Sequence, residues 1–130
     1  MKMGGFVIFF NSDQVCLGRI LSMYQKISGR HAYIESDINH IDTLSYISLE
    51  VFINVHTNYF VNDCKAGGVL FAHVAPKHVV YYIGHSNAIN FLNASAIQTG
   101  DEVFSIFDFF FTNRYNFLQA MKHQGNTDNE

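Results

Sequence analysis

Residues 46–55 read Tyr-Ile-Ser-Leu-Glu-Val-Phe-Ile-Asn-Val, and the interpretation of the other segments starts from this stretch. Aliphatic residues recur at positions 49, 51, 53 and 55, and the residues between them are polar except for Phe52. A period of two places the four aliphatic side chains on one face of a β-strand. We therefore predict a strand with one buried face, and Phe52 indicates that the other face is partly covered.

Several other apolar segments have a similar length and favour the same β-branched and aromatic residues. Turn-forming residues separate them, for example at residues 11–13, 28–29, 75–77 and 99–101. We predict strands at residues 6–10, 15–24, 31–35, 69–74, 79–83 and 102–111. Residues 56–66 are expected to be a long connection, residues 88–97 have an ambiguous pattern, and residues 115–121 are expected to be a strand or a short helix.

These segments predict an all-β fold, a small, partly open and distorted β-barrel with room for one short C-terminal helix. The chain has 130 residues, which fits a single domain, assigned to residues 1–123. The polar residues 124–130 are expected to form a disordered tail. Gly18 lies inside a predicted strand, which indicates a bulge or a close backbone approach.

The composition argues against several classes of protein. The formal net charge is -3, and the eight Lys and Arg residues are scattered along the chain. Nucleic-acid binding depends on clustered cations, so it is not expected. The longest early apolar run, residues 6–10, is too short for a signal segment or a membrane span. We expect an intracellular protein that is not secreted, with Cys16 and Cys64 as buried hydrophobic residues.

The order of four segments resembles bromo-adjacent homology domains. Residues 15–24 (Val-Cys-Leu-Gly-Arg-Ile-Leu-Ser-Met-Tyr) are similar to that family's opening strand, and residues 46–54 stand at the place of a later strand. Residues 69–84 are similar to its His- and Val-containing region, and residues 101–114 to its phenylalanine-rich closing hairpin. The resemblance spans residues 6–121. Parts of the first two segments are also similar to short fungal proteins.

Members of this family are distorted β-barrels that act as protein-interaction modules in chromatin, and some read methylated lysine on histone tails. The resemblance therefore implies a nonenzymatic nuclear module without a cofactor, with histone tails or other chromatin proteins as partners. A methyl-lysine cage needs aromatic ring faces, but this chain has Val51 and Ile53 where the reading members carry aromatic residues. We therefore assign ligand binding to strand 79–83 and loop 55–65. The candidate residues are Tyr59, Tyr81, Tyr82, His56 and His73.

Two other classes of function remain open. His73, His78 and His85 lie on or beside neighbouring predicted strands, but their spacing matches no zinc signature, so no metal site is assigned. A small hydrolase would use Cys64 with His56 or His73 as the base. The chain also has 13 Phe and 7 Tyr residues, more than a small barrel encloses, and exposed ones at 109–111 or 81–82 would favour a homodimer or another self-associating structure.

Overall fold

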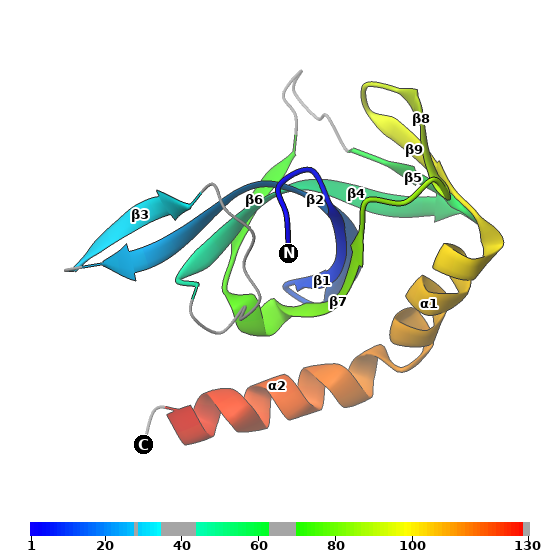
Figure 1. Ribbon diagram of the computed structural model, residues 1–130. Helices are drawn as coiled ribbons and strands as arrows, with labels where there is room; N and C mark the ends of the chain where they lie inside the picture. Colours follow the sequence, from blue (N-terminus) through cyan, green and yellow to red (C-terminus); the bar gives the residue numbers. More distant parts are fainter. Residues whose placement is uncertain (28, 35–43, 63–69, 129–130) are drawn as a thin grey trace.

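The computed structural model describes residues 1–27, 29–34, 44–62 and 70–128, and it shows a mostly β chain that ends in two helices (Figure 1). Nine strands form one antiparallel sheet that curls into a half-barrel. The elements in chain order are β1 (Phe6–Asn11), β2 (Gln14–Ile27), β3 (Arg30–Ile34), β4 (Tyr46–His56), β5 (Tyr59–Val61), β6 (Phe71–Val74), the 3-10 turn η3 (Pro76–His78), β7 (Val79–Gly84), β8 (Ile89–Asn93), β9 (Ala96–Thr99), α1 (Asp101–Thr112) and α2 (Arg114–Asp128).

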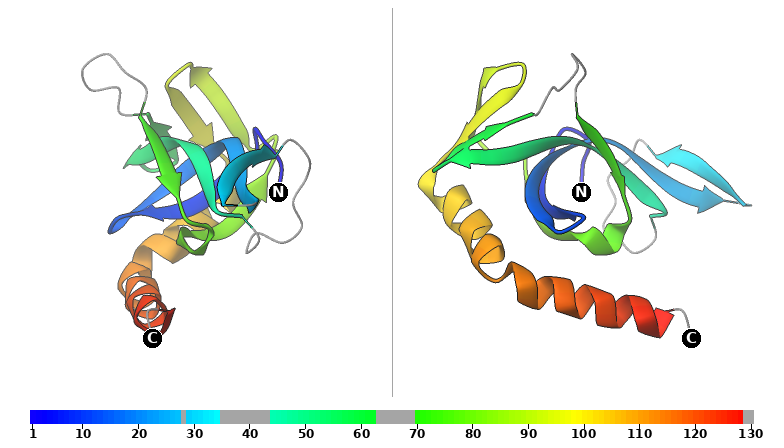
Figure 2. Two further views of the ribbon diagram at one scale, coloured as in Figure 1. Left: turned by 90° about the vertical axis from the view of Figure 1, so that its left-hand side faces the viewer. Right: turned by 180° about the vertical axis from the view of Figure 1, so that it is seen from behind.

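The curl follows from the order of the strands. The main path runs β7-β1-β2-β4-β5-β9-β8, and β6 pairs with β4 while β3 pairs with β2. Strands β6 and β7 therefore lie on opposite sides of the β1-β2-β4 centre, yet only Ala75 and the three residues of η3 join them. Such a short connection brings the two outer strands toward each other and bends the sheet around the N-terminus (Figures 1 and 2).

Strand β4 confirms the strand predicted at residues 46–55 and is buried on both faces at its middle, but the predicted buried face does not reach Val55, which is 56% exposed. Leu49 and Val51 belong to a cluster with Val7, Phe9 and other residues inside the curl, against which Met1 and Met3 pack. Phe52 points to the opposite face, into a second cluster with Phe60 and Phe107. The aromatic residue that interrupts the polar face therefore marks a second core.

A close backbone approach at Gly18 is also confirmed. A side-chain carbon at this position would lie 2.8 Å from Cε1 of Phe9, which is fully buried. The register shift between β2 and β4 occurs between Ile20 and Ser22, so the bulge is near Gly18 and not at it. Gly18 thus leaves space for an aromatic ring in the core inside the curl.

The prediction that residues 102–111 form a core strand is wrong. The predicted open barrel is confirmed as a curled half-barrel, but the chain is mostly β with two C-terminal helices and not all-β. Residues 102–111 belong to helix α1, which buries Val103, Phe107 and Phe110 against the second cluster. The spacing of four and then three residues is that of one face of a helix. Asp101 and Glu102 occupy the first turn, where carboxylates interact favourably with the helix dipole.

Other segments were predicted only in part. Residues 88–97, whose pattern was ambiguous, contain β8 and the start of β9. The expected connection at 56–66 contains strand β5, which follows a turn at Thr57, where φ is 42°. Residues 115–121 are helical, the second of the two predicted alternatives, and α2 extends to Asp128, into the segment expected to be a tail. Neither helix is long and apolar enough to cross a membrane.

Cys16 is a buried hydrophobic residue, as predicted, and burial raises the pKa of its thiol to about 12. Cys64 lies outside the described residues.

Candidate binding groove

Three clefts lie around the turn between β1 and β2, and residues of α1 or α2 line two of them. Their volumes are about 620, 360 and 270 Å³, and Ser12 lines all three. We call their combined surface the turn groove. Its lining includes the turn residues Asn11, Ser12 and Asp13, together with Phe107, Phe111 and Arg114 in the first cleft, Lys77, His78 and Lys122 in the second, and His73 and His78 in the third.

The β1–β2 turn is a tight hairpin in which Asn11 pairs with Gln14 and only two residues connect the strands. Ser12 has a φ of 55°, in the left-handed region that non-glycine residues rarely adopt. Two-residue hairpins favour turn types with a positive φ at the first connecting residue, because their twist matches that of the strands. The hairpin geometry therefore places Ser12 and Asp13 at the centre of the groove.

The first cleft combines an aromatic wall with a cation. The rings of Phe107 and Phe111 are 6.3 Å apart and nearly parallel, with an interplanar angle of 18°. The Arg114 guanidinium carbon lies 4.2 Å from the centroid of Phe111 and 4.8 Å from that of Tyr115, and Nη1 donates a hydrogen bond to the Phe111 carbonyl oxygen at 2.8 Å. These contacts hold the guanidinium at the cleft.

The elbow between α1 and α2 directs Arg114 toward this cleft. Asn113 follows the last residue of α1, and both its backbone N–H and its side-chain amide donate to the Phe109 carbonyl oxygen, at 3.1 and 2.8 Å. The side-chain bond caps the last turn of α1 at Asn113. Helix α2 begins at the next residue, and its Phe117, Leu118 and Met121 pack against the second cluster. In Figure 1, α1 descends beside the half-barrel and α2 runs below it; Figure 2 shows α2 below the half-barrel from two further sides.

His78 lines both the second and the third cleft. Its Nδ1 atom is buried and has no hydrogen-bond partner among the described residues. Desolvation by burial, and to a smaller degree the charge of Lys77, lower the pKa of the imidazole. The groove therefore contains a neutral imidazole at neutral pH beside two lysines and Asp13.

This pKa shift makes the stability of the chain dependent on pH. In the unfolded chain His78 titrates near its ordinary pKa of about 6.5, so below that pH the unfolded state binds more protons than the folded state. The neutral His78 side chain is therefore expected to contribute fully to the free energy of unfolding above about pH 6.5. As the pH falls from there toward the lowered pKa, this contribution is lost and the protein becomes less stable. Urea unfolding between pH 5 and 8 should show a shallower loss for His78→Gln than for the wild type. Lys77→Gln removes only the smaller cause of the pKa shift, so this variant should still lose most of the stability that the wild type loses at low pH. Equal pH profiles for the wild type and His78→Gln would contradict a lowered pKa of His78.

The five candidate residues from the sequence do not form one site. His56 and Tyr59 pair across β4 and β5. Tyr81 and Tyr82 are each 40% exposed. Because they are neighbours in β7, their side chains point to opposite faces of the sheet. The Tyr81 ring lies 6.1 Å from that of Phe110, and the Tyr82 hydroxyl accepts a hydrogen bond from the Lys2 backbone N–H at 3.1 Å. Only His73 lines the turn groove.

His73 is held by two neighbours on β4. Its Nδ1 atom lies 2.7 Å from the Ser48 hydroxyl oxygen, and its ring meets that of Tyr46 edge-on at a centroid distance of 5.5 Å. His73 and His78 line the same cleft, but His85 follows β7 at its other end. A rise of about 3.3 Å per residue places His85 roughly 20 Å from His78, so these three histidines do not converge. The described part of the chain contains no group of three or more His, Cys, Asp or Glu residues suited to a metal ion.

Phe107 and Arg114 of the groove were not predicted as binding residues from the sequence, and Phe111 was expected only as one of the exposed aromatic residues at 109–111. The helical spacing of Val103, Phe107 and Phe110 was the one signal that could have indicated an α1 helix and so an elbow at Arg114. Comparisons of the chain with protein-family models, with curated proteins and with solved structures gave no match.

Proposed function

We propose that this chain is a nonenzymatic protein-interaction module and that the turn groove binds an extended segment of a partner protein. The observation that carries the proposal is that three neighbouring clefts share Ser12 as a lining residue, and that residues of α1 or α2 line two of them. The largest cleft has a volume typical of ligand-binding sites. Its aromatic and polar lining provides both buried contact area and directional bonds.

An extended peptide suits this arrangement better than a compact ligand. The clefts lie around one turn and share residues, so a compact molecule would occupy one of them and leave the others unused. Peptide segments bind in succession to neighbouring recesses, with alternate side chains entering them. The half-exposed ring of Phe111, in the largest cleft, is a suitable anchor because aromatic residues dominate the binding energy of many interfaces.

The resemblance to bromo-adjacent homology domains supports chromatin proteins as a class of partner. If the partner is a chromatin protein, a histone tail would bind through the exposed Tyr81 or Tyr82 on β7, which do not line the turn groove. The two versions predict different sensitive residues, so one set of variants separates them.

The experiment is selection of random 12-residue peptides on the immobilised chain, followed by fluorescence anisotropy with the selected peptides and with an array of modified and unmodified histone peptides. We expect Phe111→Ala to weaken binding of the selected peptides about tenfold or more, as for an interface anchor. Phe109→Ala is the matched control, because Phe109 is another exposed ring of α1 (56%, against 45% for Phe111) and lines none of the three clefts.

Three outcomes would contradict the groove proposal. These are the absence of any bound peptide, binding that Phe111→Ala leaves unchanged, and binding that Tyr81→Ala or Tyr82→Ala abolishes. The last outcome, with selectivity for a histone peptide, would move the site to β7. Light scattering over a concentration series shows in the same preparation whether the exposed aromatic residues instead join copies of this chain.

A further inference from the structure

The charge of the turn groove is opposite to that of the chain. Arg114, Lys77 and Lys122 line the groove, and these are three of the eight Lys and Arg residues. Among the residues that the structure describes, Asp13 is the only Asp or Glu that lines the three clefts. The described lining residues therefore have a formal charge of +2 (three cations minus one anion), whereas the whole chain has a net charge of -3.

We propose that the partner segment is acidic and that Arg114 binds one of its carboxylates in the first cleft, while Lys77 and Lys122 attract a second one in the next cleft. This inference rests on the proposed function and adds the chemistry of the partner. Two cationic ends with the Ser12 turn between them suit a peptide with acidic residues separated by apolar ones.

Arg114 is well suited to this role. A guanidinium has five N–H donors in a planar fork and binds a carboxylate through two parallel hydrogen bonds. One Nη1 bond goes to the Phe111 carbonyl oxygen, and the planar group lies over two rings, so its orientation is set before a ligand arrives. An arginine held in this way loses little further conformational freedom on binding, which favours affinity.

A protein partner accounts for this surface better than a nucleic acid does. Proteins that bind DNA commonly neutralise about six to ten phosphates, and their affinity depends on that number. The groove has three formal cations, and Asp13 lies at its centre, where it would repel a continuous run of phosphates. An acidic peptide can place an apolar residue or a hydrogen-bond donor beside Asp13.

The test uses the whole chain and three sets of 12-residue peptides with the same apolar residues and with Glu, Gln or Lys at every third position. We expect the Glu peptides to bind about tenfold or more tightly than the Gln peptides, with a difference that shrinks as salt is added. Arg114→Gln should remove most of this preference. Arg30→Gln is the matched control, because it removes the same charge from an exposed position on β3, outside the three clefts.

The outcomes separate this inference from the groove proposal. Equal binding of the Glu and Gln peptides, still sensitive to Phe111→Ala, would overturn the acidic partner and leave the groove proposal intact. Tighter binding of the Lys peptides, or tighter Arg114-dependent binding of a 12-nucleotide single-stranded DNA, would also overturn the acidic peptide. Binding of none of the probes would overturn both proposals. If Arg114→Gln and Arg30→Gln reduced the preference for Glu peptides equally, the preference would come from the net charge of the chain and not from a site at Arg114, and the inference would be overturned.

Discussion

Replacing Phe107 with alanine is expected to lower the free energy of unfolding by about 3–5 kcal/mol, the usual cost of truncating a buried phenylalanine. Phe107 is 2% exposed, and its ring meets that of Phe60 edge-on, at a centroid distance of 4.9 Å and an angle of 88°. It is the central one of the three α1 residues buried against the sheet. Its loss would leave a cavity at the contact between α1 and β5, and the helix would lose its main anchor.

The matched control is Phe109→Ala, in the same helix. Phe109 is 56% exposed, so its truncation removes less buried area, and we expect a loss below about 1 kcal/mol. Because the chain has no Trp, urea unfolding should be followed by far-ultraviolet circular dichroism. Similar small losses for both variants would contradict the packing of α1 on the half-barrel. Because Phe107 also lines the first cleft, Phe107→Ala is expected to weaken peptide binding as well.

Strand β4 could be predicted from the sequence because its alternation of apolar and polar residues is local and few other residues obscure it. Its aliphatic residues alternate with polar ones, and such alternation has one structural meaning. Helix α1 has an equally regular pattern of buried residues, but exposed or half-buried rings at positions 104, 109 and 111 hide it. An apolar run without a visible period fits a buried strand or a helix equally well. The result was a wrong assignment for the segment with the most aromatic residues.

The turn groove could not be predicted because its residues are far apart in the sequence. The resemblance of residues 101–114 to a closing hairpin implied two strands, but residues 112–114 join two helices. Only this difference brings Arg114 beside Phe111 and near the β1–β2 turn. The five predicted binding residues came mostly from strand 79–83 and loop 55–65, and of these five only His73 lines one of the clefts.

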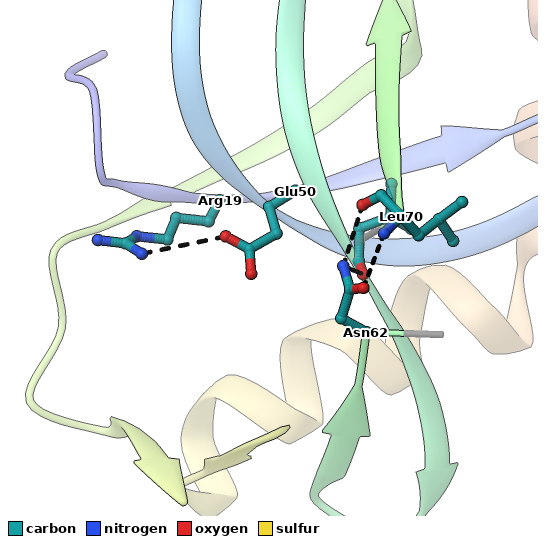
Figure 3. Close-up of polar contacts among 5 residues, drawn as sticks. Arg19, Glu50, Asn62 and Leu70 are labelled. Atoms are coloured by element: carbon teal, nitrogen blue, oxygen red, sulfur yellow. Dashed lines mark hydrogen bonds and ion pairs between the residues drawn. The ribbon is translucent and has the colours of Figure 1, made fainter. Parts of the chain in front are cut away.

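Asn62 is a further residue whose role depends on the three-dimensional structure. Strand β4 pairs with β6 as far as Glu50 and with β5 from Ile53 onward, so its partner changes over two residues. The buried Asn62 side chain lies at this junction (Figure 3). Its amide nitrogen donates to the carbonyl oxygens of Val51 and Leu70 at 2.8 and 3.0 Å, and its oxygen accepts from the Leu70 N–H at 2.8 Å.

We expect Asn62→Ala to lower the free energy of unfolding by about 2–4 kcal/mol. The substitution leaves backbone groups of Val51 and Leu70 without the partners that Asn62 provides, and an unpaired buried polar group costs about 1–3 kcal/mol. Asn62→Asp should cost at least as much, because it keeps the acceptor but places a carboxylate against two carbonyl oxygens.

Asn90→Ala is the control for Asn62→Ala, since Asn90 is exposed on β8 and its loss should stay within about 0.5 kcal/mol. Urea unfolding of the three variants and the wild type measures the difference. If Asn62→Ala matched Asn90→Ala, the junction would be held by backbone pairing alone, for which the Val51 N–H to Leu70 carbonyl bond at 3.0 Å is the nearest candidate. A large loss for Asn62→Ala, with an equal or larger one for Asn62→Asp, would instead show that the amide itself joins the two parts of the sheet, because only the amide satisfies donors and acceptors on both sides of the change of partner.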